Sequence, residues 1–149
     1  MTTLNRIDIQ KDAPELYRAY LKLDGAVAGS VLPDALQELV RIRASMINGC
    51  AYCVDMHTRD AQKGGEELPR LFAVSAWREA PLFDDRERAA FALPDAVTSI
   101  SNPAAGLDEA YEAAAEQFDN AELAALLYTI VTINGWNRLA VTAHSVFEA

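Results

Sequence analysis

Residues 33–65 read PDALQELVRIRASMINGCAYCVDMHTRDAQKGG, and this stretch predicts two helices that meet at Asn48-Gly49. Proline and an acidic residue are both favoured in the first turn of a helix, so one helix should start at residue 33. Asn-Gly is a good helix terminator, which ends that helix at about residue 47. The next helix should run from about residue 50 to the glycines at 64 and 65.

The rest of the chain shows the same helical periodicity, and the alternating apolar runs that indicate strands are almost absent. Six further helices are expected, at about 13–27, 68–78, 84–101, 107–118, 120–131 and 136–147. Pro94 should kink or break the helix that contains it, and a second Asn-Gly, at 134–135, should separate the last two. With no linker and no shift in composition, we expect an all-α fold of seven to eight helices in one domain, residues 1–149.

The chain has 149 residues, of which 51% are hydrophobic, and a formal net charge of -9. At this length a folded chain can bury a core without disulfides or structural metals. The acidic excess argues against nucleic acid and anionic membranes as partners, because both are bound by clustered Lys and Arg. No window approaches the roughly 18 to 20 apolar residues of a membrane span, and the start of the chain lacks the pattern of a secretory signal. We therefore expect a cytoplasmic protein.

The only two cysteines, Cys50 and Cys53, are followed by His57 in the pattern C-x-x-C-x-x-x-H. If Cys50 lies in the first turn of the second helix, spacings of three and four residues place all three side chains on one face. The helix N-terminus and a neighbouring imidazole both favour a thiolate. A thiolate beside a second thiol can reduce an oxidant, because the first sulfur is oxidised and the second then closes a disulfide.

Other uses of these residues are possible. A zinc site would take both cysteines and His57 and would need a fourth ligand, for which His144 is the only other histidine. Attachment of c-type haem requires a histidine directly after the second cysteine, where this chain has Val54, and is excluded. The cysteines could also be buried apolar side chains with no chemical role. Redox use fits the spacing best, so we expect no metal and no other cofactor.

Glu38 is the expected partner of His57, since a histidine that acts as a base is commonly oriented by a carboxylate. On a helical wheel Glu38 lies with Ile42, Ser45 and a glycine, away from the main apolar stripe. A carboxylate aligned with apolar and small residues is unusual on a solvated face. The alternative is a surface ion pair between Glu38 and Arg41, and the wheel alone does not decide between the two.

The chain resembles the alkylhydroperoxidase D and carboxymuconolactone decarboxylase family over nearly its full length. The resemblance rests on short segments at residues 38–45, 48–58, 65–66, 77–79, 87–90, 96–98 and 133–139. It implies an alkylhydroperoxidase D-like helical domain that assembles as a homo-oligomer, a trimer or a hexamer. It also implies that Trp136, Asn137 and Arg138 serve packing or a subunit contact.

In the redox-active branch of this family a glutamate, two cysteines and a histidine form a proton relay, and Glu38, Cys50, Cys53 and His57 occupy those positions here. The resemblance implies that Cys53 is the attacking thiolate, that His57 is its base, and that Glu38 orients His57 directly or through a water. Cys50 would be the more exposed, resolving thiol that meets the external reductant. The implied activity is a thiol-dependent peroxidase that reduces a small hydroperoxide with an external dithiol reductant.

Two further functions stay open. One is a carboxymuconolactone decarboxylase-like enzyme, from the branch of the family that does not depend on a cysteine pair. The other is an oligomeric redox sensor that uses the disulfide to change the state of a partner. The chain also departs from the best-studied peroxidase type at Tyr52, where that type has a second histidine between its cysteines.

Overall fold

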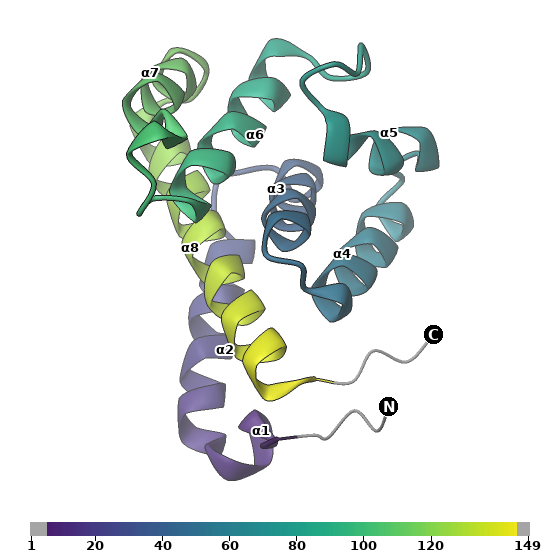
Figure 1. Cartoon of the computed structure of the whole chain (residues 1–149), viewed down its shortest axis with the longest axis vertical. Helices are drawn as coiled ribbons and strands as arrows, with labels where there is room; N and C mark the ends of the chain where they lie inside the picture. The colour runs from purple at the N-terminus through teal and green to yellow at the C-terminus, as the bar shows by residue number, and fades with distance from the viewer. Residues whose placement is uncertain (1–5, 146–149) are drawn as a thin grey trace.

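The computed structural model describes residues 6–145 and confirms the all-α fold (Figure 1). Within these residues there is no β-strand, and no helix is long and apolar enough to cross a membrane. Eight α-helices and two short 3-10 helices make up the described chain: α1 (Ile9–Asp12), α2 (Pro14–Ala28), α3 (Asp34–Ile47), α4 (Ala51–Lys63), α5 (Leu68–Ala73), η1 (Val74–Ala76), α6 (Asp85–Thr98), η2 (Pro103–Ala105), α7 (Leu107–Gln117) and α8 (Asn120–Ala143).

Helix α3 is the centre of the molecule. Helices α4, α6 and α8 all pack against it, and α2 lies along α8 on one side (Figure 1). Its apolar residues serve two cores: Leu36 and Val40 pack with α6, α7 and α8, whereas Leu39 and Ile42 pack with α5, η1 and α6. Because apolar residues on two sides of α3 are buried, this helix is enclosed by its neighbours rather than lying on the surface.

The joint between α3 and α4 follows the sequence prediction. Helix α3 ends at Ile47, and Gly49 has φ of 65°, a left-handed conformation that glycine adopts at little cost. The Cys50 backbone N–H then donates to the Ser45 carbonyl at 3.0 Å, which closes the turn. Helix α4 therefore starts directly after Cys50 and carries the cysteine pair at its N-terminus.

The expected stop at Asn134-Gly135 is wrong, because α8 continues through it as one helix, Asn120–Ala143. The Asn134 side chain donates to the Ile130 carbonyl at 2.9 Å, one turn back, so it supports the helix that it was expected to end. Gly135 makes room for Tyr20, since a Cβ at this position would overlap the Tyr20 hydroxyl and ring. The glycine therefore serves close packing between α2 and α8 and not a turn.

Pro94 was expected to kink or break its helix; the break is wrong, since α6 continues through this buried proline. A proline inside a helix forgoes one backbone hydrogen bond and costs about 3 kcal/mol. The neighbouring Asp95 accepts hydrogen bonds from Arg43 of α3, from the Trp77 indole and from Arg78. These contacts hold α6 against α3 and the segment after η1, and they offset part of the free-energy cost of the proline.

Smaller differences occur elsewhere. The segment expected as one helix at 68–78 is α5 followed by η1, and α1 was not expected at all. Helix α6 ends at Thr98 rather than near residue 101. At the end of the chain α8 stops at Ala143, where His144 has φ of 55°, and Phe147 lies outside the described residues.

Candidate active site

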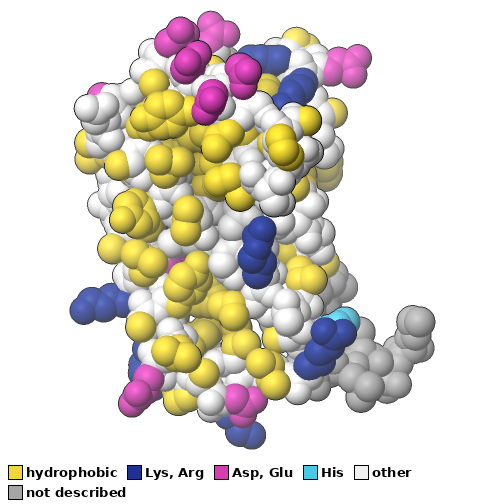
Figure 2. All heavy atoms as spheres, turned by 60° about the vertical axis from the view of Figure 1, so that its left-hand side comes forward, with side chains coloured by type: hydrophobic (Ala, Val, Ile, Leu, Met, Phe, Trp, Pro, Cys, Tyr) yellow, Lys and Arg dark blue, Asp and Glu magenta, His cyan; other side chains and the backbone are white. Residues whose placement is uncertain are grey.

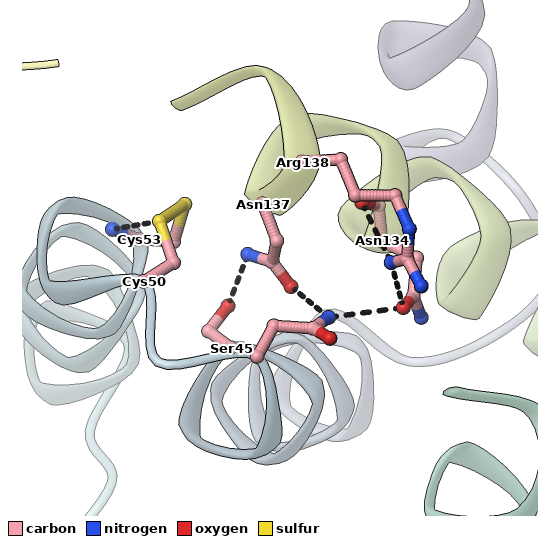
Figure 3. Close-up of a disulfide and its surroundings, with 7 residues drawn as sticks. Ser45, Cys50, Cys53, Asn134, Asn137 and Arg138 are labelled. Carbon is pink, nitrogen blue, oxygen red and sulfur yellow. Dashed lines mark hydrogen bonds between the residues drawn. A yellow bond between two sulfur atoms is a disulfide. The ribbon is translucent and has the colours of Figure 1, made fainter. Parts of the chain in front are cut away.

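The cysteine pair lies at the N-terminus of α4. Cys50 is the N-cap residue, one position earlier than the first-turn position assumed above, and its Sγ accepts a hydrogen bond from the Cys53 backbone N–H at 3.3 Å. The two sulfurs form a disulfide (Figure 3). Both cysteines are only 2% exposed. The expectation that Cys50 is the more exposed of the two is therefore wrong, because α8 and the end of α3 cover both sulfurs.

Side chains of α8 cover the disulfide. Ile133 and Ala140 pack against the cysteines in a small apolar cluster, and Trp136 lies beside it. The two sulfurs therefore lie in a largely apolar setting, apart from the helix N-terminus and the imidazole described below.

A buried amide network holds α8 to the α3–α4 joint. Asn48 donates to Asn134 and to Asn137, each at 2.9 Å, and Asn137 donates to the Ser45 hydroxyl at 2.9 Å (Figure 3). Asn137 and Ser45 are fully buried. Arg138 donates to Asn134 from the outer side. The packing role expected for Asn137 is confirmed, and the network fixes the turn that carries Cys50.

His57 lies one helical turn after Cys53 and is bonded to Glu38. The His57 Nδ1 and the Glu38 Oε2 are 2.8 Å apart, and the side chains are 10% and 16% exposed. An ionised carboxylate can only accept a hydrogen bond, so Nδ1 carries the hydrogen and donates it to Glu38, which leaves Nε2 as the basic nitrogen of the ring. Glu38 was expected to orient His57 directly or through a water, and the contact is direct.

The alternative partner of Glu38 is present as well. Arg41 donates to Glu38 Oε1 at 2.6 Å and to the Gln37 side chain at 3.0 Å. Gln37 is fully buried and donates to the Leu32 carbonyl at 2.8 Å. Each oxygen of Glu38 therefore has its own partner. Arg41, which also binds Gln37, binds Oε1, and His57 binds Oε2.

These contacts set the charge of Glu38. Burial alone would raise the pKa of its carboxyl, but the hydrogen bond and charge of His57, together with the charge and hydrogen bond of Arg41, bring the pKa below its ordinary value of 4.5. Glu38 is accordingly an anion at neutral pH and can act only as an acceptor for the imidazole.

The lowered pKa predicts a pH-dependent contribution to stability. A carboxyl whose pKa is lower in the folded state contributes fully above its ordinary pKa, and the contribution disappears as pH falls through the folded value. We expect Glu38→Gln to reduce the free energy of unfolding by about 1.5 kcal/mol at pH 7, typical of a hydrogen bond to a charged group. The difference from the unsubstituted protein should shrink as pH falls below 4.5.

Urea denaturation at pH 7 and at several values below 4.5 measures this difference. Glu116→Gln is the matched control, because Glu116 is an exposed glutamate on α7 and should change little at any pH. A Glu38→Gln penalty that stays constant across the series would contradict the assignment.

Two separate pockets adjoin the disulfide. The first, here called the Cys53 pocket, has a volume of about 370 Å³. Its lining includes Tyr17, Asp24, Tyr52, Cys53, Met56, His57 and Trp136. The second, here called the Cys50 groove, is wider at about 680 Å³. Its lining includes Ser45, Met46, Cys50, Ala51, Val54, Thr58 and Arg59. No residue lines both, and each cysteine lines a different one.

Aromatic side chains form one wall of the Cys53 pocket. Trp136 of α8 meets Tyr17 edge to face at 5.5 Å and Tyr20 at 4.5 Å, both from α2. Tyr20 in turn donates to the Thr132 carbonyl at 2.7 Å. No local pattern indicates this wall, because it joins residues more than a hundred positions apart. The only available signal was the helical spacing of the two tyrosines.

The zinc alternative does not match this geometry. Cysteines joined as a disulfide offer no thiolate ligands, and His144, the proposed fourth ligand, is exposed beyond the end of α8. Among the described residues, donor atoms of Glu38, His57 and Asp60 lie within 4.8 Å of one another. Glu38 and His57 already bind each other there, so we assign no metal to this group.

The match to known families agrees with the fold and the site. The model of the carboxymuconolactone decarboxylase family matches residues 14–96, more than half of the chain, and this match covers α2 to α6 with Glu38, both cysteines and His57. The protein belongs to the carboxymuconolactone decarboxylase family.

Individual relatives support the same assignment. The uncharacterized protein YdfG of Bacillus subtilis (strain 168) is 34% identical over 136 residues, which are 91% of this chain and 92% of YdfG. A crystal structure of ATU0492 from Agrobacterium tumefaciens, of unknown function and suggested to be an antioxidant defence protein AhpD, has a TM-score of 0.93 at 36% identity. It covers 97% of this chain and 99% of its own.

A more distant structure shares the fold alone. The debrominase Bmp8 has a TM-score of 0.81 at 20% sequence identity, over 94% of this chain and 75% of its own. The family relationship makes an enzymatic role the natural one for this chain, while the reaction has to be argued from the site.

Proposed function

We propose that the protein is a thiol-dependent peroxidase that reduces a hydroperoxide through Cys50 and Cys53, with His57 and Glu38 as a proton relay. The observation that carries the proposal is the juxtaposition of three features: a cysteine pair at a helix N-terminus, a histidine in the same pocket as Cys53, and a partly buried carboxylate 2.8 Å from Nδ1 of that histidine. Together they provide a nucleophile, a base and an orienting group.

The proposed oxidation uses only these side chains. His57 takes the proton of the Cys53 thiol, and the thiolate attacks one oxygen of the hydroperoxide. The O–O bond breaks, the departing alkoxide takes the proton from His57, and Cys53 becomes a sulfenic acid. The Cys50 thiol then attacks the Cys53 sulfur, which forms the disulfide and releases water.

An external dithiol completes the cycle by thiol–disulfide exchange. One of its thiolates attacks the protein disulfide and forms a mixed disulfide, and its second thiol displaces the protein sulfur. The reductant leaves as a disulfide and both protein thiols are restored. No metal, haem or flavin enters this scheme.

The Cys53 pocket favours this reaction over decarboxylation of a lactone acid. Among the described residues that line it there is no Lys or Arg to hold a carboxylate, and Asp8 and Asp24 add negative charge. An acid substrate would meet repulsion here, whereas an uncharged hydroperoxide would meet an apolar wall beside His57.

Thiol counting tests the peroxidase proposal. We expect the fully reduced protein to lose two thiols on addition of one equivalent of cumene hydroperoxide and to form one equivalent of cumyl alcohol. A thiol reagent and chromatography measure the two quantities. Unchanged thiols with intact peroxide would refute the proposal, and the control is the same protein with its thiols blocked beforehand.

We further propose that the protein assembles as a homo-oligomer. Exposed apolar side chains gather over α2 and α8, as Figure 2 shows for this side, and they include Leu16 at 75%, Tyr128 at 57% and Val131 at 55% exposed. Sedimentation of reduced and oxidised protein measures the assembly. The same experiment separates peroxidase from sensor, because a sensor should change its assembly on oxidation and should turn over peroxide slowly.

A further inference from the structure

The Cys53 pocket and the Cys50 groove lie on opposite sides of α4. Tyr52, Cys53, Met56 and His57 line the pocket. Ala51, Val54, Asp55, Thr58 and Gln62 line the groove. At 3.6 residues per turn the two sets are centred roughly half a turn apart. Helix α4 therefore separates the Cys53 pocket from the Cys50 groove. The disulfide at its N-terminus joins a residue that lines the pocket to a residue that lines the groove.

The two hollows also differ in chemical character. The Cys53 pocket contains the imidazole that the peroxide reaction needs, and its Trp136 wall limits what can enter. The Cys50 groove has an apolar floor that includes Met46, Ala51 and Val54, with the Arg59–Asp55 ion pair at its edge. It is the larger of the two and has room for a thiol that is part of a bulkier molecule.

Thiol–disulfide exchange imposes a direction of approach. The attacking thiolate forms its bond in line with the S–S bond that breaks, from behind the sulfur that it attacks. Cys50 lines the groove and Cys53 does not, so a reductant in the groove is adjacent to Cys50 rather than to Cys53. Its attack expels the Cys53 thiolate on the side of the pocket, which also contains His57. Attack on Cys53 instead would have to come through the pocket that the peroxide uses.

We propose that the two half-reactions use opposite faces of α4, with the hydroperoxide entering the Cys53 pocket and the dithiol reductant entering the Cys50 groove to attack Cys50. The proposal rests on the proposed peroxidase function. In the reductive step, the reductant thiolate bonds to Cys50 Sγ and the S–S bond breaks, so that Cys53 leaves as a thiolate. The second thiol of the reductant then displaces Cys50, which leaves as a thiol, and the reductant is released as a disulfide. The alcohol product therefore need not leave before reduction begins.

Matched tryptophan substitutions on the two sides of α4 test the proposal. Met56→Trp narrows the Cys53 pocket and Ala51→Trp fills the Cys50 groove, and both positions are exposed, so a larger side chain can be accommodated. Each half-reaction is followed separately by rapid alkylation of free thiols and mass spectrometry. Cumene hydroperoxide is the probe for oxidation, and dithiothreitol is the probe for reduction of protein oxidised beforehand with diamide.

We expect Met56→Trp to slow oxidation by about tenfold or more and to change the rate of reduction by less than about twofold. Ala51→Trp should slow reduction by about tenfold or more and change the rate of oxidation by less than about twofold. A tenfold change in rate corresponds to about 1.4 kcal/mol of barrier. Thr58→Trp, one to two turns further along the groove, repeats the test if Ala51→Trp does not fold. Saturating cumyl alcohol should leave reduction unchanged. A pair of variants that slow both half-reactions alike, or competition between cumyl alcohol and dithiothreitol, would overturn the proposal.

Failure of the proposed function gives a different result. If cumene hydroperoxide oxidises no form of the protein, the peroxidase proposal fails. The diamide-oxidised protein still reports on the groove, because Ala51→Trp must slow reduction by dithiothreitol and Met56→Trp must not. Equal reduction rates in the two variants would then exclude the groove as the entry of the reductant.

Discussion

The variant Cys53→Ser is expected to lose peroxide reduction almost completely, by roughly a thousandfold or more in rate, which corresponds to about 4 kcal/mol of barrier. A serine hydroxyl has no accessible anion at neutral pH and is a poor nucleophile toward an O–O bond, so His57 would have nothing to activate. The remaining thiol of this variant, Cys50, is not in the pocket that contains the imidazole. Loss of hydroperoxide, followed by a colorimetric assay for residual peroxide, measures the effect.

Cys50→Ser is the matched control, since it removes a sulfur at the same helix end. It should still consume one equivalent of peroxide per chain and stop there, with Cys53 held as a sulfenic acid that a dimedone-type reagent traps. If Cys53→Ser consumed the equivalent and Cys50→Ser did not, the two roles would have to be exchanged. This exchange of roles is a genuine alternative, because the Cys53 N–H donates a hydrogen bond to Cys50 Sγ and the helix N-terminus therefore also favours a thiolate on Cys50.

The second large effect concerns stability. Asp95→Ala should lower the free energy of unfolding by about 3 kcal/mol, because breaking a buried ion pair leaves the partner charge uncompensated. Arg43 and Asp95 are only 15% and 13% exposed, and Asp95 also accepts from the Trp77 indole at 3.2 Å. The loss would remove the link that joins α3, the segment after η1 and α6. Chemical denaturation monitored by circular dichroism measures it.

A surface ion pair provides the comparison. Asp60→Ala removes the partner of Lys63, and these side chains are 49% and 77% exposed. Pairs of this kind contribute less than about 1 kcal/mol, so the midpoint of unfolding should hardly change. Equal destabilisation by Asp95→Ala and Asp60→Ala would show that the buried network does not hold the helices together.

The two Asn-Gly dipeptides show how far local sequence could predict the fold. Asn48-Gly49 ends a helix because nothing opposes the left-handed conformation of Gly49 there. Asn134-Gly135 has the same local preference, but Asn134 bonds within its own helix and Tyr20 occupies the space beside Gly135. Contacts with α2, more than a hundred residues earlier, therefore decide the second case, and no local pattern contains that information.

In the candidate site, too, the features set within one helix were predictable, and those set by packing between helices were not. Cys50, Cys53 and His57 were predictable because their spacings within one helix fix their relative positions. Glu38 was predictable as a candidate from its place on the wheel. That it binds Arg41 and His57 at the same time was not predictable, since this depends on how α3 and α4 pack. The Cys53 pocket, the aromatic wall and the amide network all involve α2 or α8, and the Cys50 groove lies between α3 and α4. These features required the tertiary structure.

The cysteine pair occupies a single turn at the beginning of a helix, and its Cα atoms are 5.3 Å apart. That turn is held by backbone hydrogen bonds and by the amides of α8, and none of these bonds involves a sulfur atom. Opening and closing the disulfide therefore requires side-chain rotation alone, and no segment has to unfold and refold in each cycle. In the proposed reaction the scaffold therefore stays unchanged while the two sulfurs change oxidation state.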